Sequence, residues 1–453
     1  MLLALFCILI LLYGFHQYMN KKKENGAIVF FFFLTEGFHF LNKGWCPVKY
    51  TDFAVIYLVG IVFINLLEGN VAFFRLKTKI YKITCILGLF IFLEFLRTIL
   101  LKEESFSFAL ANYRTYIPFF SFFIAQELKI SGIKKILKVI TIITIIGAVL
   151  YVIQPLIGIQ TLQHAGIGRG VGGTFRYRNI PYLVYFYILY SSVKFDSSRI
   201  KNIVMLLLFL VAVILTQHRA VLLAYIACIA LYFLMSKRLG RLLQIGVLGI
   251  VLFAFWGNYV IDRFSEKKND HTIVEDVENV VNLDYQSAVS SGFENEGGTL
   301  SFRVLLLIER VDYMLKNPDY LFFGIGTRHE DSPATQRDFS FILGTLKQDG
   351  SHGQISSSDL AWLNPLMRFG LIGISLFIYL SYLIIAYLYK NRKRSAIAMS
   401  AFLFYGLLIA ISLKNDHLYG NMQMFFVFLL IEYIRKTNRI KTIGLTPRKF
   451  DLI

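Results

Sequence analysis

Residues 357–380 read SSDLAWLNPLMRFGLIGISLFIYL, a polar entrance followed by a mostly apolar run that continues to residue 389. Such a run is long enough for a membrane-crossing helix, which needs about 20 apolar residues. Asp359, Asn364 and Arg368 stand at its start, although polar side chains of this kind are costly to place in a membrane. Their position predicts that polar groups gather around this end of the helix.

The composition of the whole chain agrees with this interpretation. Of its 453 residues, 56% are hydrophobic and only 17% are charged, whereas soluble domains carry about one-quarter charged residues. Four scattered cysteines form neither a disulfide framework nor a metal-binding motif, and the chain contains no Asp-x-Asp pair. We therefore expect a polytopic membrane protein with no metal and no cofactor.

The apolar runs define candidate membrane spans. They lie at residues 1–18, 27–41, 53–70, 83–101, 113–128, 137–157, 181–193, 202–216, 219–235, 242–261, 359–389, 395–413 and 420–434. We expect an all-α fold with about 12–13 transmembrane helices and one long extracytoplasmic loop.

The basic residues lie mainly in alternate connections between these runs. Seven such segments hold 27 of the 47 Lys and Arg residues: 21–23, 75–82, 129–138, 194–201, 237–241, 390–394 and the tail from 435. Because positive loops stay in the cytoplasm, this pattern predicts an external N-terminus and an internal C-terminus. It also explains the net charge of +18 without a nucleic-acid partner.

The chain divides into spans at 1–261, the long outer loop at 262–358, further spans at 359–434 and a basic cytoplasmic tail at 435–453. The loop holds 9 basic and 16 acidic residues. Its pattern predicts a helix near 299–316, on which Arg303 and Arg310 share one face because they are seven residues apart. These arginines can bind an anion, or pair at the surface with Glu309 or Asp312.

A second outer connection, 157–181, has a different character. It contains six glycines and the arginines Arg169, Arg176 and Arg178, but no acidic residue. Glycines allow backbone N–H groups to converge on a ligand, and arginines bind phosphate oxygens with two parallel hydrogen bonds. The segment therefore predicts a site for a polyanion such as diphosphate; the alternative is a flexible turn whose arginines meet lipid headgroups. Arg219, in the tight turn TQHRA, joins this set.

In their order, these features resemble the O-antigen polymerase and ligase superfamily. The resemblance covers roughly residues 140–430. It consists of the arginine hairpin TQHRA, a loop helix ending in Asn317-Pro318, the turn Gly324-Ile325-Gly326, and Asp359 ahead of Gly370-Leu371-Ile372-Gly373. In the ligases a histidine beside an asparagine stands at the loop end, and here Asp359 stands there, which is more similar to the repeat-unit polymerases.

The resemblance implies a GT-C-like membrane glycosyltransferase that polymerises undecaprenyl-diphosphate-linked repeat units at the outer face of a bacterial cytoplasmic membrane. Its partners would be lipid-linked donor and acceptor, with a chain-length regulator and a flippase. The expected catalytic residues are Asp359 and His352. Diphosphate binding is expected from Arg169, Arg176, Arg178, Arg219, Arg303 and Arg310, and glycan binding from His329, Asn364 and Arg368.

Other interpretations remain open at this point. Asp359 can simply cap the helix that follows it. Within the family, a ligase that transfers the glycan to a lipid A core is the alternative. The intramembrane acids Glu36, Glu68 and Glu94 leave room for a lipid-glycan flippase or proton-coupled transporter, although Glu94 is spaced to pair with Arg97 on one helix face.

Overall fold

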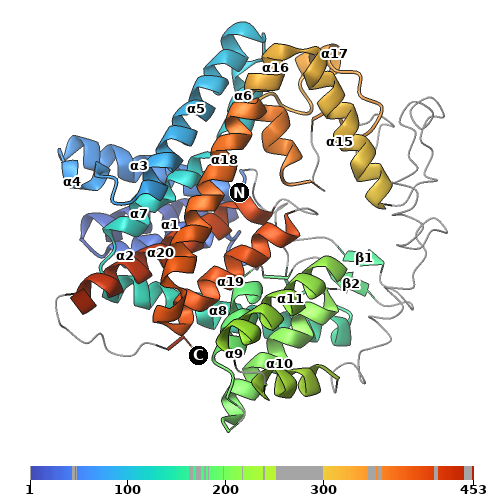
Figure 1. Ribbon diagram of the computed structural model, residues 1–453. Coiled ribbons are helices and arrows are strands. Elements are labelled where there is room, and N and C mark those ends of the chain that lie inside the picture. The colour runs from blue at the N-terminus through green and yellow to red at the C-terminus, as the bar shows by residue number, and fades with distance from the viewer. Residues whose placement is uncertain are drawn as a thin grey trace.

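The computed structural model describes residues 2–42, 46, 48–162, 167–169, 175–177, 180–181, 183–196, 198–216, 218–237, 240–250, 299–344, 353–355, 360–412, 417–442 and 451–452. Within these ranges the fold is helical apart from two strands of three residues each (Figure 1).

The first part of the chain forms one series of helices. These are α1 (Leu2–Met19), α2 (Lys23–Leu34), α3 (Tyr50–Leu67), α4 (Val71–Phe74), α5 (Lys79–Leu101), α6 (Phe106–Tyr113), the 3-10 helix η2 (Ile117–Ser121), α7 (Phe122–Glu127) and α8 (Ile130–Ile157). The strands β1 (Ile167–Arg169) and β2 (Phe175–Tyr177) then form an antiparallel hairpin in which Gly168 faces Arg176 in the register.

The remaining helices follow the hairpin. They are α9 (Val184–Val193), α10 (Ile200–Leu215), α11 (Arg219–Ser236), α15 (Thr299–Lys316), α16 (Pro318–Phe323), α17 (Pro333–Asp338), α18 (Leu363–Asn391), η4 (Arg392–Arg394), α19 (Ala396–Ile411), η5 (His417–Tyr419) and α20 (Asn421–Thr442). The loop helix expected near 299–316 coincides with α15.

Local sequence signals explain where several helices begin and end. The hydroxyl of Thr78 accepts a hydrogen bond from the backbone N–H of Tyr81 at the start of α5, and Ser395 accepts one from Ala398 at the start of α19. These hydroxyls satisfy N–H groups that have no partner inside the helix. Gly158 ends α8 in the left-handed conformation, which glycine adopts without a steric penalty.

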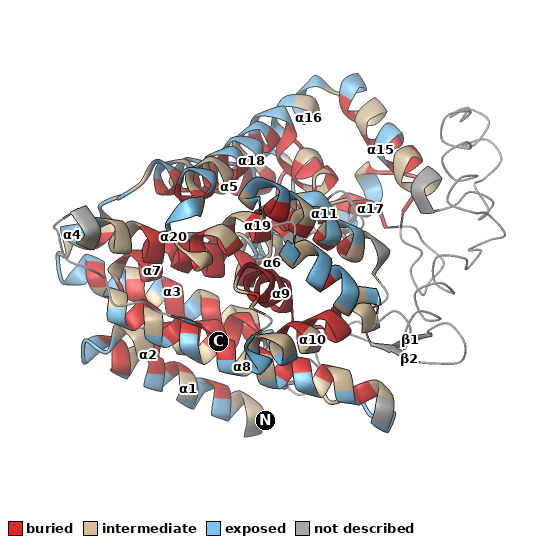
Figure 2. Ribbon diagram, turned by 60° about the horizontal axis from the view of Figure 1, so that its bottom comes forward, coloured by how far each residue is buried: buried red, intermediate tan, exposed pale blue. Residues whose placement is uncertain are grey.

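The centre of the bundle is built from α9, α19 and α20. Every residue of α9 is buried, and Figure 2 shows α9 and α20 as buried ribbons surrounded by half-exposed helices. The ring of Phe186 on α9 meets those of Phe404 on α19 and Phe426 on α20 at centroid distances of 5.7 and 4.9 Å. Edge-to-face aromatic contacts of this kind stabilise a close-packed core.

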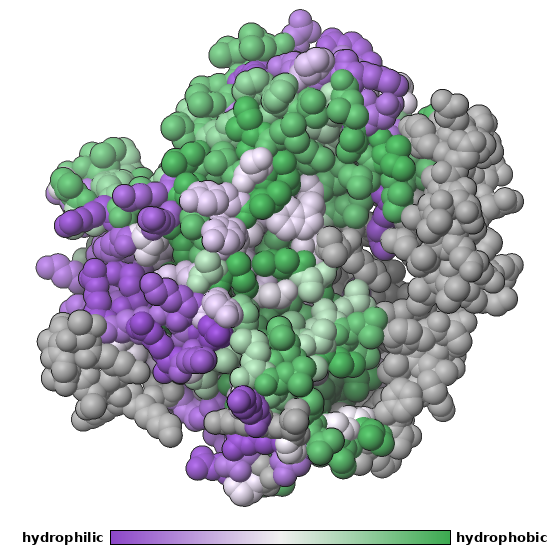
Figure 3. Space-filling model, viewed as in Figure 1, coloured by the Kyte–Doolittle hydropathy of each residue, from purple (hydrophilic) through white to green (hydrophobic). Residues whose placement is uncertain are grey.

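The outer surface of the bundle is apolar. Four of the described helices are long and apolar enough to cross a membrane, namely Tyr50–Leu67, Lys79–Leu101, Ile130–Pro155 and Leu363–Arg394, and several shorter apolar helices accompany them. In the space-filling view of Figure 3, hydrophobic residues cover the face over α5 and α18, with hydrophilic residues gathered toward the edges. The chain is an all-α polytopic membrane protein, as the sequence predicts.

The basic connections meet at one end of the bundle. Lys77 and Lys436 donate to the backbone carbonyl of Gln126 at 3.1 and 3.0 Å, and Lys23 pairs with Glu127 at 2.7 Å. The 23 residues of α5 lead from this end to the opposite end, about 34 Å away at 1.5 Å per residue. That length matches the hydrocarbon core of a bilayer, about 30 Å thick.

Three candidate spans differ from the sequence prediction. The run 27–41 is helical only to Leu34, where α2 ends, and its remaining residues form turns in which Gly37 has a positive φ. The run 113–128 is not one helix but is divided among the end of α6, η2 and α7, because Pro118 lies within it and cannot donate a backbone hydrogen bond. The final long span begins at Leu363, with Trp362 at its N-cap position. Asp359, the residue predicted to cap this helix, lies outside the described residues.

Candidate functional site

A turn of the long loop contacts a break in helix α18 at the end of the bundle opposite the basic connections. The backbone N–H of Ile325 donates to the carbonyl of Met367, and that of Gly326 donates to the carbonyl of Arg368, both at 2.8 Å. Inside α18, Gly370 has the non-helical angles φ 58° and ψ −162°. The loop turn therefore pairs with backbone groups beside the break and is fixed to the mouth of α18.

Glycine is required on both sides of this contact. Gly324 and Gly370 have φ values of +74° and +58°, which residues with a side chain rarely adopt. A Cβ atom on Gly324 would overlap the backbone of Arg368, and one on Gly370 would overlap the backbone of Phe322. The two glycine motifs, far apart in sequence, thus meet as one structural element.

Arg368 and Asn364, both predicted to bind glycan, lie together beside this contact. Nε of Arg368 donates to Oδ1 of Asn364, and its Nη1 donates to the backbone carbonyl of Arg328, each at 2.8 Å. The amide of Asn112 on α6 donates to the same carbonyl. Arg368 is only 6% exposed, so its cation is enclosed by protein acceptors from the loop and from its own helix.

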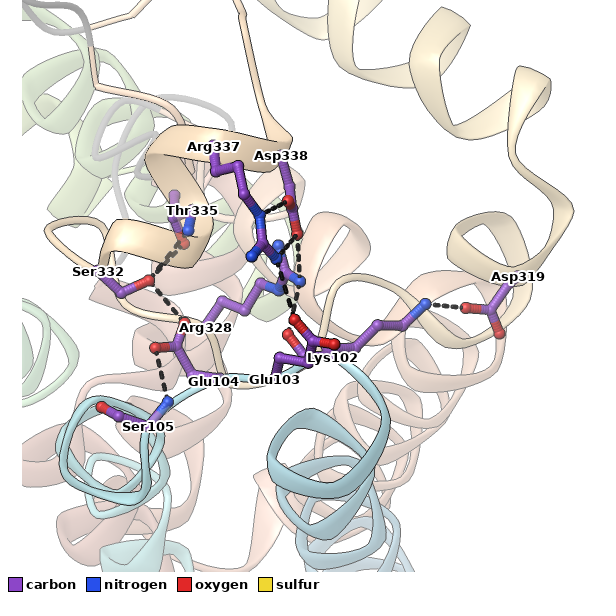
Figure 4. A network of polar contacts seen from close by, with 10 residues as sticks. All are labelled: Lys102, Glu103, Glu104, Ser105, Asp319, Arg328, Ser332, Thr335, Arg337 and Asp338. Carbon is purple, nitrogen blue, oxygen red and sulfur yellow. Dashed lines mark hydrogen bonds and ion pairs between the residues drawn. The ribbon is translucent and has the colours of Figure 1, made fainter.

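Arg328 is the residue that sequence reasoning missed. Its side chain is 1% exposed, forms an ion pair with Asp338 at 2.7 Å and donates to the carbonyl of Lys102 at 3.0 Å (Figure 4). Its Nε and Nη1 have no hydrogen-bond partner in the described part of the chain. The sequence signal for Arg328 is its place two residues after the Gly324-Ile325-Gly326 turn and next to His329.

Ion pairs attach the loop to the end of α5. Asp319 accepts from Lys102 at 2.5 Å and from Arg97 at 2.9 Å, and Arg97 also pairs with Glu94 at 2.8 Å, as predicted for these two residues. Partial burial raises the pKa of Asp319, but the hydrogen bond from Lys102 and the charge of Arg97 outweigh it, so the pKa is lowered overall. The carboxylate therefore stays ionised and holds α16 against α5.

His329 lies beside this attachment. Its ring stacks on Phe108 with a centroid distance of 5.3 Å, and its Nδ1 accepts a hydrogen bond from the backbone N–H of Asp331 at 3.2 Å. Burial lowers the pKa of His329, and the charges of Arg368 and Lys49 lower it further, against the opposing effect of Asp331. These contacts favour a neutral ring that carries its proton on Nε2.

Arg310 is held inside the loop. It is 2% exposed, pairs with Glu309 and donates to the carbonyls of Leu343 and Gly353. This is the pairing with Glu309 that the sequence left open, although it is buried rather than at the surface. Arg303, seven residues before Arg310 on the same face of α15, is half-buried.

The carboxylate of Glu309 also accepts the backbone N–H of Ile342 at 2.8 Å. Glu330 accepts the N–H groups of Gln354 and Ile355 in the same manner. The carboxylates of Glu309 and Glu330 therefore hold the described backbone before and after His352. His352 itself and Asp359 lie outside the described residues.

The other predicted diphosphate ligands are placed only in part. Arg169 ends β1 and Arg176 lies in β2, which packs beside α8, while Arg219 begins α11. The structure describes the backbone of these three residues but not their side chains, and Arg178 lies outside the described residues. Among the described residues, no group of three or more His, Cys, Asp or Glu side chains is arranged to hold a metal ion.

Comparison with known proteins agrees with this geometry. Residues 204–378 match the family model described as O-Antigen ligase. The match includes α15, α16, α17 and the first half of α18, and so contains both glycine motifs. No curated protein matches the chain. Residues 204–378 are thus similar to the O-antigen ligase domain, which supports the resemblance of this chain to the O-antigen polymerase and ligase superfamily.

Proposed function

We propose that this protein is a glycosyltransferase that polymerises undecaprenyl-diphosphate-linked repeat units at the outer face of a bacterial cytoplasmic membrane. The observation that carries the proposal is the agreement between the family match and the loop contact. The matched segment contains the turn at Gly324, the break at Gly370 and the polar cluster around Arg368, all at one end of the spans.

In the proposed reaction, the bond between an anomeric carbon and a diphosphate oxygen breaks, and the acceptor hydroxyl oxygen forms a new bond to that carbon. The hydroxyl proton passes to Asp359 or His352. The diphosphate leaves with its negative charge stabilised by Arg169, Arg176, Arg178 and Arg219. Positioning two lipid-linked substrates and stabilising the leaving charge are the main contributions required of the protein.

The residues that the structure describes would bind the glycan or hold the loop in position. His329 presents Nε2–H as a donor for a glycan hydroxyl, since its Nδ1 already accepts from Asp331. Arg368 and Asn364 hold the mouth of α18 to the loop. Arg310 is occupied by acceptors within the loop, so in this proposal it orders the segment before His352, and Arg303 remains the candidate on α15 for a phosphate group.

The test is incubation of purified protein with a native lipid-diphosphate repeat unit in the presence of EDTA, with products resolved on a gel. We expect a ladder from the wild type and none from folded Arg176→Ala or Asp359→Ala. Transfer to a lipid A core, without a ladder, would favour the ligase, which the description of the matching family supports as the second candidate. Movement of the intact lipid across a vesicle bilayer, with no transfer at all, would replace the enzyme by a transporter.

A further inference from the structure

A second polar site lies at the opposite end of the bundle from the loop contact. It is a cavity of about 560 Å³ formed where α1, α3 and α7 end and where α2 and α8 begin. Two of these helices, α3 and α8, are candidate membrane spans. The cavity therefore lies at the depth of the lipid headgroups, on the side where the basic connections meet.

One wall of the cavity is fixed by internal contacts. Glu127 accepts hydrogen bonds from the hydroxyl of Tyr18 at 2.5 Å and from Lys23 at 2.7 Å, and the amide of Asn65 donates to that hydroxyl at 2.6 Å. Asn65 is 1% exposed. These groups satisfy one another, so they define the shape of the cavity and leave little net charge on this wall.

Four other charged side chains line the same cavity: Lys21, Glu24, Glu68 and Lys129. None of them has a side-chain hydrogen bond or ion pair with another residue of the described part of the chain. Two ammonium groups and two carboxylates thus surround one space without neutralising each other. A ligand with both a negative and a positive group would satisfy both kinds of side chain.

The first turn of α8 adds to the cationic part of the lining. Ser131 and Gly132 line the cavity, and Lys129, the N-cap residue, makes no side-chain capping bond. The unpaired N–H groups and the dipole of a helix N-terminus attract phosphate. Together with Lys129, they form an anion-binding corner beside the carboxylates.

The rim of the cavity is apolar. Met19 belongs to the lining and is exposed. Leu67 and Val71, which are next in sequence to the lining residues Glu68 and Asn70, are 71% and 79% exposed. A soluble ligand would gain nothing from such a rim, whereas acyl chains would cover it. We propose that this cavity binds the headgroup of a phospholipid that carries a phosphate and a primary ammonium group.

The experiment measures lipid binding to the purified full chain by native mass spectrometry in detergent. The probes are phosphatidylethanolamine, phosphatidylcholine, phosphatidylglycerol and soluble phosphoethanolamine. We expect the first to bind most tightly, because its ammonium group can donate hydrogen bonds to a carboxylate, unlike the trimethylammonium of phosphatidylcholine, and because its acyl chains cover the apolar rim. Lys129→Met and Glu68→Gln should each weaken it about ten-fold, the effect of one charge-assisted hydrogen bond. Lys138→Met, an exposed lysine on α8 outside the lining, should bind like the wild type.

Three outcomes would overturn the proposal. Equal binding of all lipids by every variant would mean that only bulk lipid contacts are present. Tighter phosphatidylglycerol binding that depends on Lys129 but not on Glu68 would identify an anionic lipid instead. Binding of soluble phosphoethanolamine as tight as that of the lipid would remove the role of the apolar rim.

A second measurement uses only the wild-type protein, so its result does not depend on whether the variants fold. A photoreactive phosphatidylethanolamine should crosslink to peptides from the start of α2 or of α8, and excess unlabelled lipid should compete. Crosslinks confined to other segments would contradict the assignment. None of these readouts requires glycan transfer, so they are independent of the proposed enzyme activity.

Discussion

Nη1 of Arg368 donates a 2.8 Å hydrogen bond to the backbone carbonyl of Arg328, 40 residues earlier in the chain. This bond joins the mouth of α18 to a residue two positions after the Gly-x-Gly turn of the loop. The buried guanidinium of Arg368 constrains the position of the loop, because moving the loop away would leave this cation without one of its two acceptors, which is costly. The polar side chains at the start of α18 therefore fix the loop in place.

Asn364→Ala tests this constraint directly. It removes the side-chain acceptor of Arg368 Nε and should lower the stability of the loop by about 1–3 kcal/mol. Combined with Arg368→Lys, the effects should be non-additive by roughly 0.5–3 kcal/mol, because both changes break the same contact. Denaturant-dependent proteolysis of the loop measures both quantities; simple additivity would show that the two side chains act independently.

Gly324→Ala should detach the loop turn. The added Cβ would overlap the backbone of Arg368 at a φ of +74°, so the turn cannot keep its two hydrogen bonds to α18. We expect rapid proteolysis within 299–344 and loss of glycan transfer, while the helical circular dichroism of the bundle remains.

Gly158→Ala is the matched control. Gly158 has a similar φ of +67°, but nothing lies within 4 Å of its added Cβ. It should suffer only the penalty of the left-handed conformation, about 1–2 kcal/mol, with an intact loop. If both variants lost the loop equally, backbone strain alone would explain the requirement for glycine.

The elements of this region are predictable from the sequence, but their contact is not. The helix near 299–316, the Gly-Ile-Gly turn and the glycines after Arg368 were all recognisable from periodicity and turn residues. Their meeting depends on packing between segments about 40 residues apart, which no local pattern encodes. The break at Gly370 was hidden for the same reason, since the surrounding residues read as one apolar helix.

Burial of charge was the second feature that the sequence could not reveal. The sequence predicts that a pair between Arg310 and Glu309 lies at the surface, yet the pair is enclosed by the loop core. Arg328 drew no attention, although it is among the largest fully buried side chains. Arginines are mostly exposed, so only the three-dimensional packing around Phe339 and Lys102 identifies one that is not.

His329 should give a pH-dependent contribution to stability. Its pKa in the folded protein is below the ordinary 6.5, so the unfolded chain takes up the proton first as the pH falls. Stability is therefore full above about pH 6.5 and declines as the pH drops from that value toward the folded pKa. His329→Gln should remove this part of the pH dependence. NMR titration of labelled histidine is the direct check, and a midpoint for His329 above 6.5 would contradict the assigned environment.

Glu309→Gln should be the most damaging neutral substitution on α15. The carboxylate satisfies the buried guanidinium of Arg310 and accepts the backbone N–H of Ile342 at 2.8 Å. Removing its charge leaves a buried cation without its counter-ion, which costs about 3–5 kcal/mol. The segment before His352 should become sensitive to protease, and glycan transfer should fall with it.

Asp312→Asn on the same helix provides the comparison. Asp312 pairs with Lys316 at 2.6 Å, but the two side chains are 43% and 72% exposed, and a solvated i,i+4 pair contributes only about 0.2–0.5 kcal/mol. Thermal unfolding and loop proteolysis should therefore barely change. Since both substitutions remove one negative charge from α15, a similar loss in the two variants would mean that net charge, rather than the enclosed pair, holds the loop. A large loss in Glu309→Gln alone would locate the loop's stability in the enclosed contact between Glu309 and Arg310.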